Sequence, residues 1–318
     1  MLRVGVIGEV GREEVVSALI AFGAQLPRRS EPFLDEPGVE VYDLAARAAP
    51  TAPTVPPVQF VIRVLEAPVD SPGGDDEADA SVSFAPRDDF ADSMAQLWQN
   101  RLVPFEENLR ACRRARRARA PVLAEPRASW AADAARIVGR LERVIGEWAL
   151  RIDHIGSTSV PGLPAKDLVD IQVTVEDLAS AQRGSESARQ AGFVHVSGDW
   201  YGEDRFGIEH PEAVAVDADP GRPVNINFRP HTVPVWRDAL LFRDWLRRHT
   251  DERDAYASMK QALAAGGSDV DRYSEDKMPW IRGALARAEA WAAASGWTPG
   301  SHITGVVGSA RGAARRRR

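Results

Sequence analysis

Short apolar, β-branched runs alternate with amphipathic stretches along the first third of the chain, which is typical of an α/β protein. The chain opens as strand, loop and helix: an apolar run ends at Gly8, and apolar positions at helical spacing follow up to Phe22. In this part the pattern predicts strands over residues 2–7 and 59–65 and helices over residues 13–22 and 92–119.

The second half of the chain shows a longer series of amphipathic segments, which begins near Val122. Ser129 is a candidate N-cap, because its hydroxyl can accept a hydrogen bond from the first turn of a helix. An acidic stretch that contains Trp200 and Tyr201 is expected to be a solvated loop. The predicted elements are helices over residues 129–150, 178–190, 236–248, 251–264 and 273–295 and strands over residues 151–155, 168–175 and 225–228.

Local composition divides the chain into domains. Residues 47–57 are rich in Pro and predict an extended linker. Residues 70–92 hold eight acidic residues and one Arg, which predicts a solvated or disordered acidic insert. The arginine-rich residues 110–119 are expected to be solvated charge at a helix end. We therefore expect a first domain over residues 1–115, a second over residues 122–297 and a disordered basic tail over residues 298–318.

Overall composition limits the class of protein. The 318 residues, 44% hydrophobic and 27% charged, fit a globular protein of two domains. A net charge of −6 does not favour nucleic acid as a partner. Cys112 is the single cysteine, so no intrachain disulfide can form, and a cytoplasmic location is expected. No apolar run approaches the roughly 18 residues of a membrane span, so no membrane contact is expected.

The loop after the first predicted strand has the position of a phosphate-binding loop but not its chemistry. The pattern G-x-x-x-x-G-K-[ST] needs a lysine for the phosphates and a hydroxyl for Mg²⁺. Glu14 replaces that lysine, Val15 replaces the hydroxyl, and Glu13 adds a second carboxylate that repels phosphate. This degenerate phosphate loop consists of Gly8, Gly11, Glu13, Glu14 and Val15, and ATP binding is not expected there.

The first domain resembles dephospho-CoA kinase at both of its ends. The opening segment through Gly11 and the helical residues 97–110 carry the resemblance. The segment that bears the family's aspartate reads Pro27-Arg28-Arg29-Ser30 here and has no carboxylate. The resemblance implies a P-loop-kinase-like fold, and the altered loop implies a degenerate domain to which the kinase activity of coenzyme A biosynthesis is not carried over.

The segment from Asp153 to Ile171 is the most informative motif. A predicted strand leads to Gly156-Ser157-Thr158-Ser159, whose backbone N–H groups and hydroxyls can cradle a phosphate. Lys166 adds positive charge, and Asp170 on the next strand can hold a divalent metal. A Gly-Ser pair followed by a strand aspartate is the layout of nucleotidyltransferase-type folds. The alternative is a Ser/Thr-rich turn with Asp170 as a structural hydrogen-bond acceptor.

The same segment closely resembles the GrpB family, also called UPF0157, which implies an α+β nucleotidyltransferase-like fold for residues 122–297. Further matches are residues 126–130, Asn225-Ile226-Asn227, Phe242-Arg243-Asp244, Tyr256 with Lys260, and Tyr273 with Lys277. A degenerate kinase-like domain followed by a GrpB domain resembles the two-domain dephospho-CoA kinases of actinobacteria. In those proteins the GrpB part is regarded as a folding accessory of the kinase.

The carboxylates for nucleotidyl transfer are incomplete. A two-metal mechanism normally needs an Asp-x-Asp pair and a third acid. The pair reads Asp170-Ile171-Gln172 here, and Asn225 and Asn227 occupy the strand that supplies the third acid. Asn227 also replaces a histidine that is usual in the family. His154, beside the Gly-Ser loop, is expected to be a packed strand residue rather than a general base.

We therefore expect a non-kinase accessory protein or a protein that binds a nucleotide or another anion. A nucleotidyltransferase acting at the Gly-Ser loop and Asp170, and a residual dephospho-CoA kinase, are the alternatives, so catalysis stays open. Asp170 is the candidate catalytic and Mg²⁺-binding residue, and a Mg²⁺-nucleotide, a small phosphorylated ligand or a protein is the expected partner. The candidate ligand-binding residues are Gly156, Ser157, Thr158, Lys166, Asn225, Arg243, Lys260 and Lys277.

Overall fold

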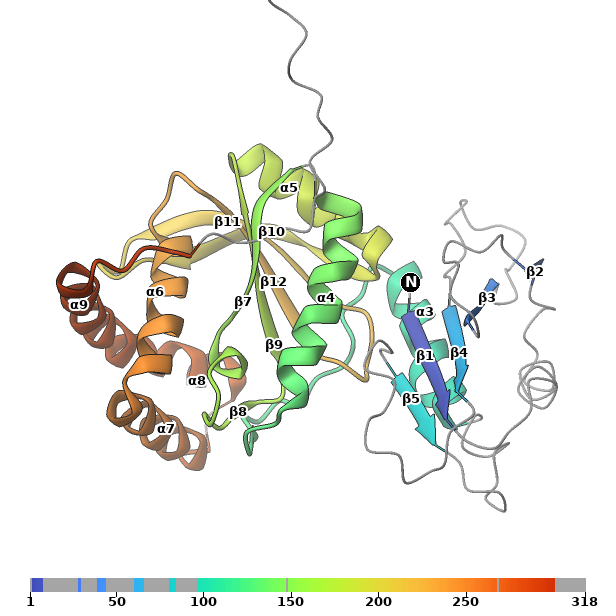
Figure 1. Ribbon diagram of the computed structural model, residues 1–318, viewed down its shortest axis with the longest axis horizontal. Helices are drawn as coiled ribbons and strands as arrows, with labels where there is room; N and C mark the ends of the chain where they lie inside the picture. Colours follow the sequence, from blue (N-terminus) through green and yellow to red (C-terminus); the bar gives the residue numbers. More distant parts are fainter. Residues whose placement is uncertain are drawn as a thin grey trace, which may run out of the picture.

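The computed structural model describes the backbone of five strands before residue 84 and, beyond them, residues 96–146, 148–267 and 269–300. The five strands are β1 (Leu2–Ile7), β2 (Arg28–Arg29), β3 (Val39–Asp43), β4 (Phe60–Leu65) and β5 (Ala80–Ser83). They form one sheet in the order β2-β3-β4-β1-β5, in which β1 is parallel to both of its neighbours (Figure 1). β1 and β4 confirm the two strands predicted in this region.

The sheet corrects one prediction for the first domain. β5 lies within residues 70–92, so the expectation of a solvated or disordered insert is wrong for residues 80–83. Parallel pairing with β1 supplies the backbone partners that a loop would lack. The degenerate phosphate loop, the helix over residues 13–22 and the linker over residues 47–57 lie outside the described residues.

The helix that precedes the second domain is shorter than predicted. A π-helical turn (Trp98–Leu102) continues into α3 (Val103–Arg110), and helical structure ends there instead of at residue 119. The following residues 112–119, which we call the arginine strap, lie against the second sheet. Within the strap the Ala115 N–H donates to the Asp217 carbonyl at 3.0 Å, and Arg117 pairs with the Asp217 carboxylate. These tertiary contacts replace the backbone bonds of a longer helix.

The second domain is built on a five-stranded sheet in the order β10-β11-β12-β9-β7. Its strands are β7 (Ala149–Ile155), β9 (Val169–Val175), β10 (Phe193–Glu203), β11 (Glu209–Asp217) and β12 (Val224–Pro230). β12 and β9 are parallel, whereas the other neighbours are antiparallel. Strands β6 (Leu123–Ala124) and β8 (Ala165–Lys166) form a separate pair. A mixed sheet with helices confirms the predicted α/β class.

One face of this sheet is apolar because alternate residues of β9 and β12 point to the same side. The alternation places Val169, Ile171, Val173, Val224, Ile226 and Phe228 in one buried cluster. Helix α4 (Ser129–Ile145), helix α5 (Leu178–Ser187) and the 3₁₀ turn η3 (Ala188–Ala191) pack on this face. The main core therefore lies on one side of the sheet, and the other side is left for polar groups.

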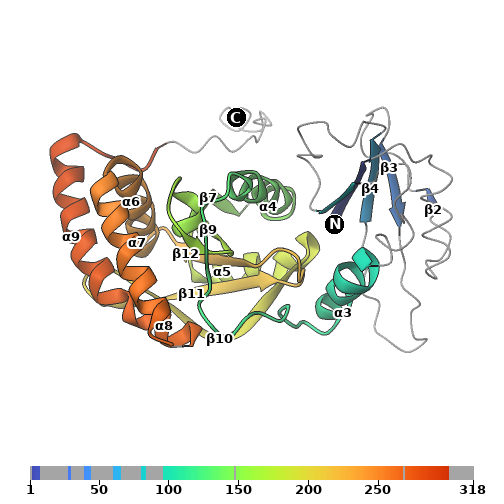
Figure 2. The ribbon, with the colours of Figure 1, turned by 90° about the horizontal axis from the view of Figure 1, so that it is seen from below.

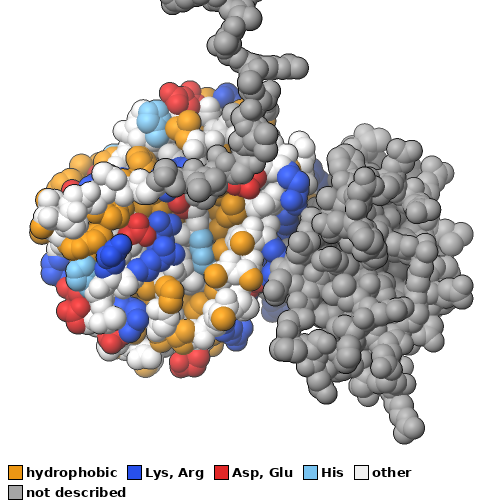
Figure 3. Space-filling view, viewed as in Figure 1, with side chains coloured by type: hydrophobic (Ala, Val, Ile, Leu, Met, Phe, Trp, Pro, Cys, Tyr) orange, Lys and Arg blue, Asp and Glu red, His pale blue; other side chains and the backbone are white. Residues whose placement is uncertain are grey.

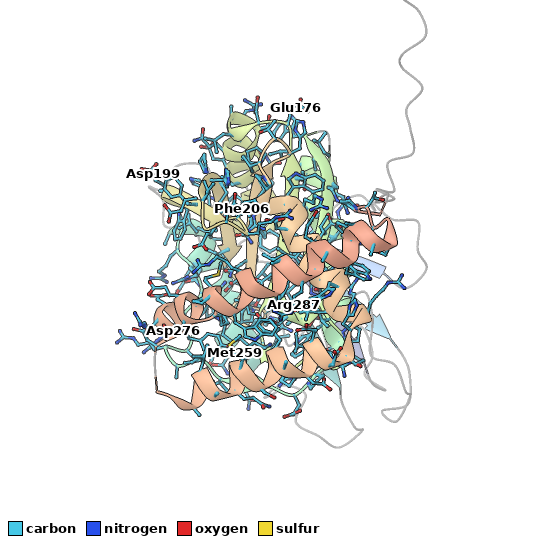
Figure 4. The ribbon with its side chains drawn as sticks, turned by 90° about the vertical axis from the view of Figure 1, so that its left-hand side faces the viewer. Glu176, Asp199, Phe206, Met259, Asp276 and Arg287 are labelled. Atoms are coloured by element: carbon cyan, nitrogen blue, oxygen red, sulfur yellow. The ribbon has the colours of Figure 1, made fainter. Side chains whose placement is uncertain are left out.

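Four further helices stand together at one end of the second sheet (Figure 2). They are α6 (Val235–Arg248), α7 (Thr250–Ala265), α8 (Val270–Asp276) and α9 (Met278–Ser295). Leu241, Tyr256 and Leu285 belong to their shared core, and Arg287 lies between α9 and α7, where its guanidinium pairs with Glu252 at 2.7 Å (Figure 4). None of the described helices is long and apolar enough to cross a membrane.

Two helix predictions need correction. Ser129 is the first residue of α4 and not its N-cap, because Ala128 holds that position and no side chain caps it. The single helix predicted over residues 273–295 is two helices, which meet at Lys277 with Pro279 in the first turn of α9. A proline there lacks the N–H that would continue the preceding helix. At this break Lys277 lines a pocket with Asp170 of β9 and Asn225 of β12.

The acidic stretch around Trp200 is part of a long hairpin and not the expected loop. Trp200 pairs with Glu212 across β10 and β11, and the register shifts between Val196 and Trp200. Asp204 closes the turn, since its carboxylate accepts the N–H groups of Phe206 and Ile208 at 2.8 and 3.0 Å. Local polarity is a poor guide here, because one surface of the hairpin tip faces solvent.

The fold makes a paired prediction about two phenylalanines. Phe228→Ala removes a fully buried ring from the sheet core and is expected to lower the free energy of unfolding by about 3–5 kcal/mol. Phe206→Ala, at a hairpin tip that leaves the ring 76% exposed, is expected to change it by less than about 0.5 kcal/mol. Urea unfolding of both variants checks this, and equal losses would contradict the placement of the core.

Candidate functional site

The polar face of the second sheet carries the candidate site. Where β9 and β12 run parallel, Asp170 stands beside Asn225 and Gln172 stands beside Asn227 in the ladder. These side chains alternate with the apolar residues of the core, so they point away from α4 and α5. The same alternation that builds the core therefore lines up a carboxylate and three amides on the opposite face.

A pocket of about 160 Å³ opens at the end of β9 that follows the Gly-Ser loop. Elements distant in the sequence meet there: the loop after β7, strand β8, helix α7 and the junction of α8 and α9. Five of the predicted ligand-binding residues and Asp170 line it. The complete lining is Ser157, Ala165, Lys166, Leu168, Asp170, Asn225, Lys260, Tyr273, Ser274 and Lys277.

Gly156 lets the loop pass directly beside Asp170. Its backbone has φ 68° and ψ −172°, a conformation that side chains disfavour, and it leads into the 3₁₀ turn η2 (Ser157–Ser159). A Cβ at this position would lie 3.0 Å from the Asp170 Cγ and closer still to its Oδ2. The glycine of the motif is thus required by a close approach of backbone to carboxylate.

All the lysines of the chain meet in this pocket. The sequence contains 40 Lys and Arg residues, of which three are lysines, and those three are Lys166, Lys260 and Lys277. Lys260 is almost fully buried on α7, where its ammonium donates to the Ser157 hydroxyl at 3.1 Å and to the Pro164 carbonyl. The three positive charges are opposed by one carboxylate at the pocket wall, Asp170.

Aromatic rings support the ammonium groups. Lys260 Nζ lies 4.8 Å from the centre of the Tyr256 ring, and Lys277 and Lys166 lie 4.8 and 5.4 Å from the centre of the Tyr273 ring. A cation over the face of a ring is attracted by the negative quadrupole of that face. The rings therefore offset part of the repulsion among the lysines without neutralising their charge.

Enclosure and mutual repulsion change the proton affinities in the pocket. Burial, with the neighbouring Lys277 and Lys166, lowers the pKa of Lys260 to about 7. Burial and Lys166 lower the pKa of Lys277 to about 8, and burial lowers the pKa of Lys166 as well. Enclosure raises the pKa of Asp170, although Lys166 and Lys277 oppose that shift. A bound anion would reverse the lysine shifts, because it favours the charged amines.

The arginine strap reaches this site through Arg117. Its guanidinium donates to the Asn225 Oδ1 at 3.0 Å and to the Val224 carbonyl at 2.6 Å. With its oxygen held in this way, Asn225 turns its Nδ2 toward Asp170 Oδ1, 3.4 Å away. The sequence analysis missed Arg117, because an arginine in a run of arginines carries no periodic signal.

Three predicted ligand-binding residues do not line the pocket: Gly156, which lies against Asp170, Thr158 and Arg243. Thr158 is buried, and its hydroxyl hydrogen-bonds His154 Nε2 at 3.0 Å and donates to the Leu168 carbonyl at 3.3 Å. Burial, with Arg247 and Arg243, lowers the pKa of His154 to about 4, so this ring is neutral. Arg243 donates to the His154 carbonyl and to Asp244. Basic side chains gather on the surface in the region of α6 (Figure 3).

The residues around Asp170 do not fit a two-metal centre. Gln172 is fully buried, donates to the Trp236 carbonyl and accepts from Arg229, so its amide is committed to the fold. Among the described residues no three His, Cys, Asp or Glu side chains form a metal-binding group. Lysines surround Asp170 instead, and they repel a divalent cation.

The chain is similar to proteins of two kinds, GrpB proteins and dephospho-CoA kinases. The family model described as GrpB protein matches residues 120–287. A dephospho-CoA kinase of Mycolicibacterium paratuberculosis is 41% identical over 223 residues, which cover 64% of this chain and 54% of that protein. A UPF0157 protein of Halalkalibacterium halodurans is 34% identical over 155 residues, which cover 48% of this chain and 73% of that protein.

A solved structure, that of the conserved protein GrpB from Enterococcus faecalis, is 23% identical in sequence to this chain. The two structures align with a TM-score of 0.43, and the alignment covers 54% of this chain and 99% of that one. The present chain spans about half the length of the dephospho-CoA kinases it matches. The resemblance of the sequence to the GrpB family and to two-domain actinobacterial dephospho-CoA kinases is thereby confirmed.

The loop geometry predicts that a side chain at Gly156 lowers the stability of the fold. Gly156→Ala is expected to destabilise the protein by more than about 1 kcal/mol beyond Gly296→Ala, because a methyl group would displace Asp170. Gly296 is a matched control, since its φ is also 68° but nothing lies within 4 Å of an added Cβ. Thermal unfolding of both variants, and of Gly156→Ala with Asp170→Ala, provides the test. The double change should recover part of the loss, and no recovery would show that Asp170 is not the obstacle.

Proposed function

This chain belongs to the GrpB family, and from that premise we propose that its GrpB domain binds a phosphorylated small molecule, such as a nucleotide, in the three-lysine pocket. In this proposal the protein is an accessory or binding protein and not a kinase. The observation that carries it is the convergence of every lysine of the chain on one pocket that holds a single carboxylate.

The chemistry of the pocket suits a tetrahedral dianion. Ammonium groups are compact charges with three donors each, and phosphate oxygens accept such bonds strongly. The Ser157 hydroxyl and Asn225 add neutral hydrogen-bonding groups at the same wall. A volume of about 160 Å³ accommodates one phosphoryl group, while the rest of the ligand extends outside.

A nucleotidyltransferase is the second candidate, favoured by the strand carboxylate directly behind the Gly-Ser loop. It requires that Asp170 hold Mg²⁺, which the surrounding lysines oppose. We do not extend the kinase activity named in the relatives to this chain, because Glu14 and Val15 replace the lysine and hydroxyl of the phosphate loop.

Asp170 separates the two candidates. In the anion pocket its carboxylate competes with the ligand, so Asp170→Asn is expected to raise the affinity for inorganic phosphate by roughly tenfold, and Lys277→Gln to lower it by at least as much. Isothermal titration with phosphate in EDTA buffer, and with ATP with and without Mg²⁺, measures both variants. If the protein is a nucleotidyltransferase, ATP binding should instead depend on Mg²⁺, and Asp170→Asn should abolish it.

The lysine content offers a direct readout of occupancy. Acetic anhydride at pH 8 can acetylate these three lysines and the N-terminal amine, and the half-buried Lys277, with its pKa near 8, is expected to react. Bound phosphate is expected to slow acetylation of Lys277 about tenfold, since it holds the amine protonated and covers it. Mass spectrometry follows each site, and the N-terminal amine is the internal control. An unchanged rate at Lys277 in saturating phosphate would refute anion binding there.

A further inference from the structure

The arginine strap is seated firmly beside the lysine pocket. Ala115 is 2% exposed, and its N–H bond to Asp217 ties the strap to β11. At the other end the Val270 N–H donates to the Arg119 carbonyl at 3.0 Å, which ties the strap to the start of α8. Strap and pocket therefore share two walls, the sheet and α8.

Arg117 anchors the strap at the side of the pocket. Its pairing with Asp217, which is almost fully buried, and its bond to Asn225 hold it against the floor of the site. Burial lowers the pKa of Lys166 and raises that of Asp170; the positive charge of Arg117 adds to the first shift and opposes the second. A strap held in this way presents its other arginines at fixed positions next to the lysines.

A hollow of about 900 Å³ lies along the strap, next to the lysine pocket. Arg113, Arg114, Arg116 and Arg119 line it together with Arg117, and its acidic residues are Asp269 and Asp271. Asp269 is occupied as the N-cap of α8, where it accepts the Arg272 N–H. Among the described residues, none forms an ion pair or a side-chain hydrogen bond with Arg114 or Arg116, and both are exposed.

Helix α8 joins the two hollows. Its residues Val270 and Asp271 line the arginine hollow, and Tyr273 and Ser274, less than one turn further, line the lysine pocket. A third groove, of about 830 Å³, contains Asn225 of the lysine pocket as well as Arg114 and Asp271 of the arginine hollow. A ligand anchored at the lysines can therefore continue toward the strap.

We propose that the arginine strap is a second anion subsite, which takes a further phosphoryl group of the same ligand. The ligand class is then a compound with two or more phosphoryl groups joined in a chain, such as a nucleoside di- or triphosphate. A monophosphate in the lysine pocket leaves the strap arginines without an anion. The inference rests on the proposed function, and it assigns a binding role to residues 112–119, which precede the family match.

Affinity for a series of phosphate chains tests the subsite. Orthophosphate, pyrophosphate and tripolyphosphate are titrated into the full chain in EDTA buffer at constant ionic strength, because salt screens exposed arginines. Affinity is expected to rise by about tenfold from orthophosphate to tripolyphosphate. In Arg114→Gln/Arg116→Gln that rise is expected to shrink below about threefold, while orthophosphate binding stays within about twofold.

A matched variant controls for charge alone. Arg183→Gln/Arg248→Gln removes the same charge from exposed positions on α5 and α6, and it is expected to keep the full rise. Failure of the native chain to bind any of the three phosphates would refute the proposed function itself. Binding of all three with equal affinity, or an undiminished rise in Arg114→Gln/Arg116→Gln, would overturn the subsite and leave the lysine pocket standing.

Discussion

Three ammonium groups that share one small pocket repel one another, and much of the second domain serves to hold them there. Asp170 supplies one opposing charge, the rings of Tyr256 and Tyr273 supply negative faces, and the Pro164 carbonyl accepts directly from Lys260. These interactions offset the repulsion only in part, which is why the pKa of Lys260 falls to about 7. Lysine charge at neutral pH is therefore incomplete until an anion enters.

The pocket contains lysines, although arginine is far more common in this chain, and the two side chains differ in size and in how readily they lose a proton. Arginine carries nearly all of the positive charge elsewhere, including the ion pairs of Arg229 and Arg205. A guanidinium is broad, planar and never deprotonated, whereas an ammonium is compact and loses its proton when burial demands it. In a pocket of about 160 Å³ with three converging cations, a lysine can relieve the repulsion by releasing its proton, which an arginine cannot do.

The sequence analysis named Asp170 and five other residues that line the pocket, but it missed the strap beside them. The Gly-Ser loop, Lys166 and Asp170 lie close in the chain, so their spacing alone brought them together. Lys260 and Lys277 came from the family resemblance, because the helix junction that turns Lys277 inward is marked only by Pro279. Thr158 and Arg243 lie outside the pocket lining, and each hydrogen-bonds to a backbone carbonyl inside the fold, that of Leu168 or of His154.

The strands and helices with strong alternation, such as β9 and α6, were predicted within a residue or two, since burial on one face fixes their period. β10 and the strap were missed for the opposite reason. The end of the hairpin is exposed and mixes polar residues with apolar ones such as Phe206, and the strap follows a helical pattern that its contacts with Asp217 and α8 override. Both depend on partners distant in the sequence, which local pattern cannot contain.

A metal site carries surplus negative charge, whereas this polar side of the sheet carries surplus positive charge, because most of its carboxylates are paired. On this face Glu212 pairs with Arg229 at 2.7 Å and Asp153 pairs with Arg151 at 2.6 Å, and at the end of β11 Asp217 pairs with Arg117. Each of these three carboxylates is thus matched by its own arginine, and Gln172, Asn225 and Asn227 place amides on the same sheet. Asp170 alone faces lysines that outnumber it. A face built in this way attracts anions, because its surplus charge is positive and its negative charge is already paired.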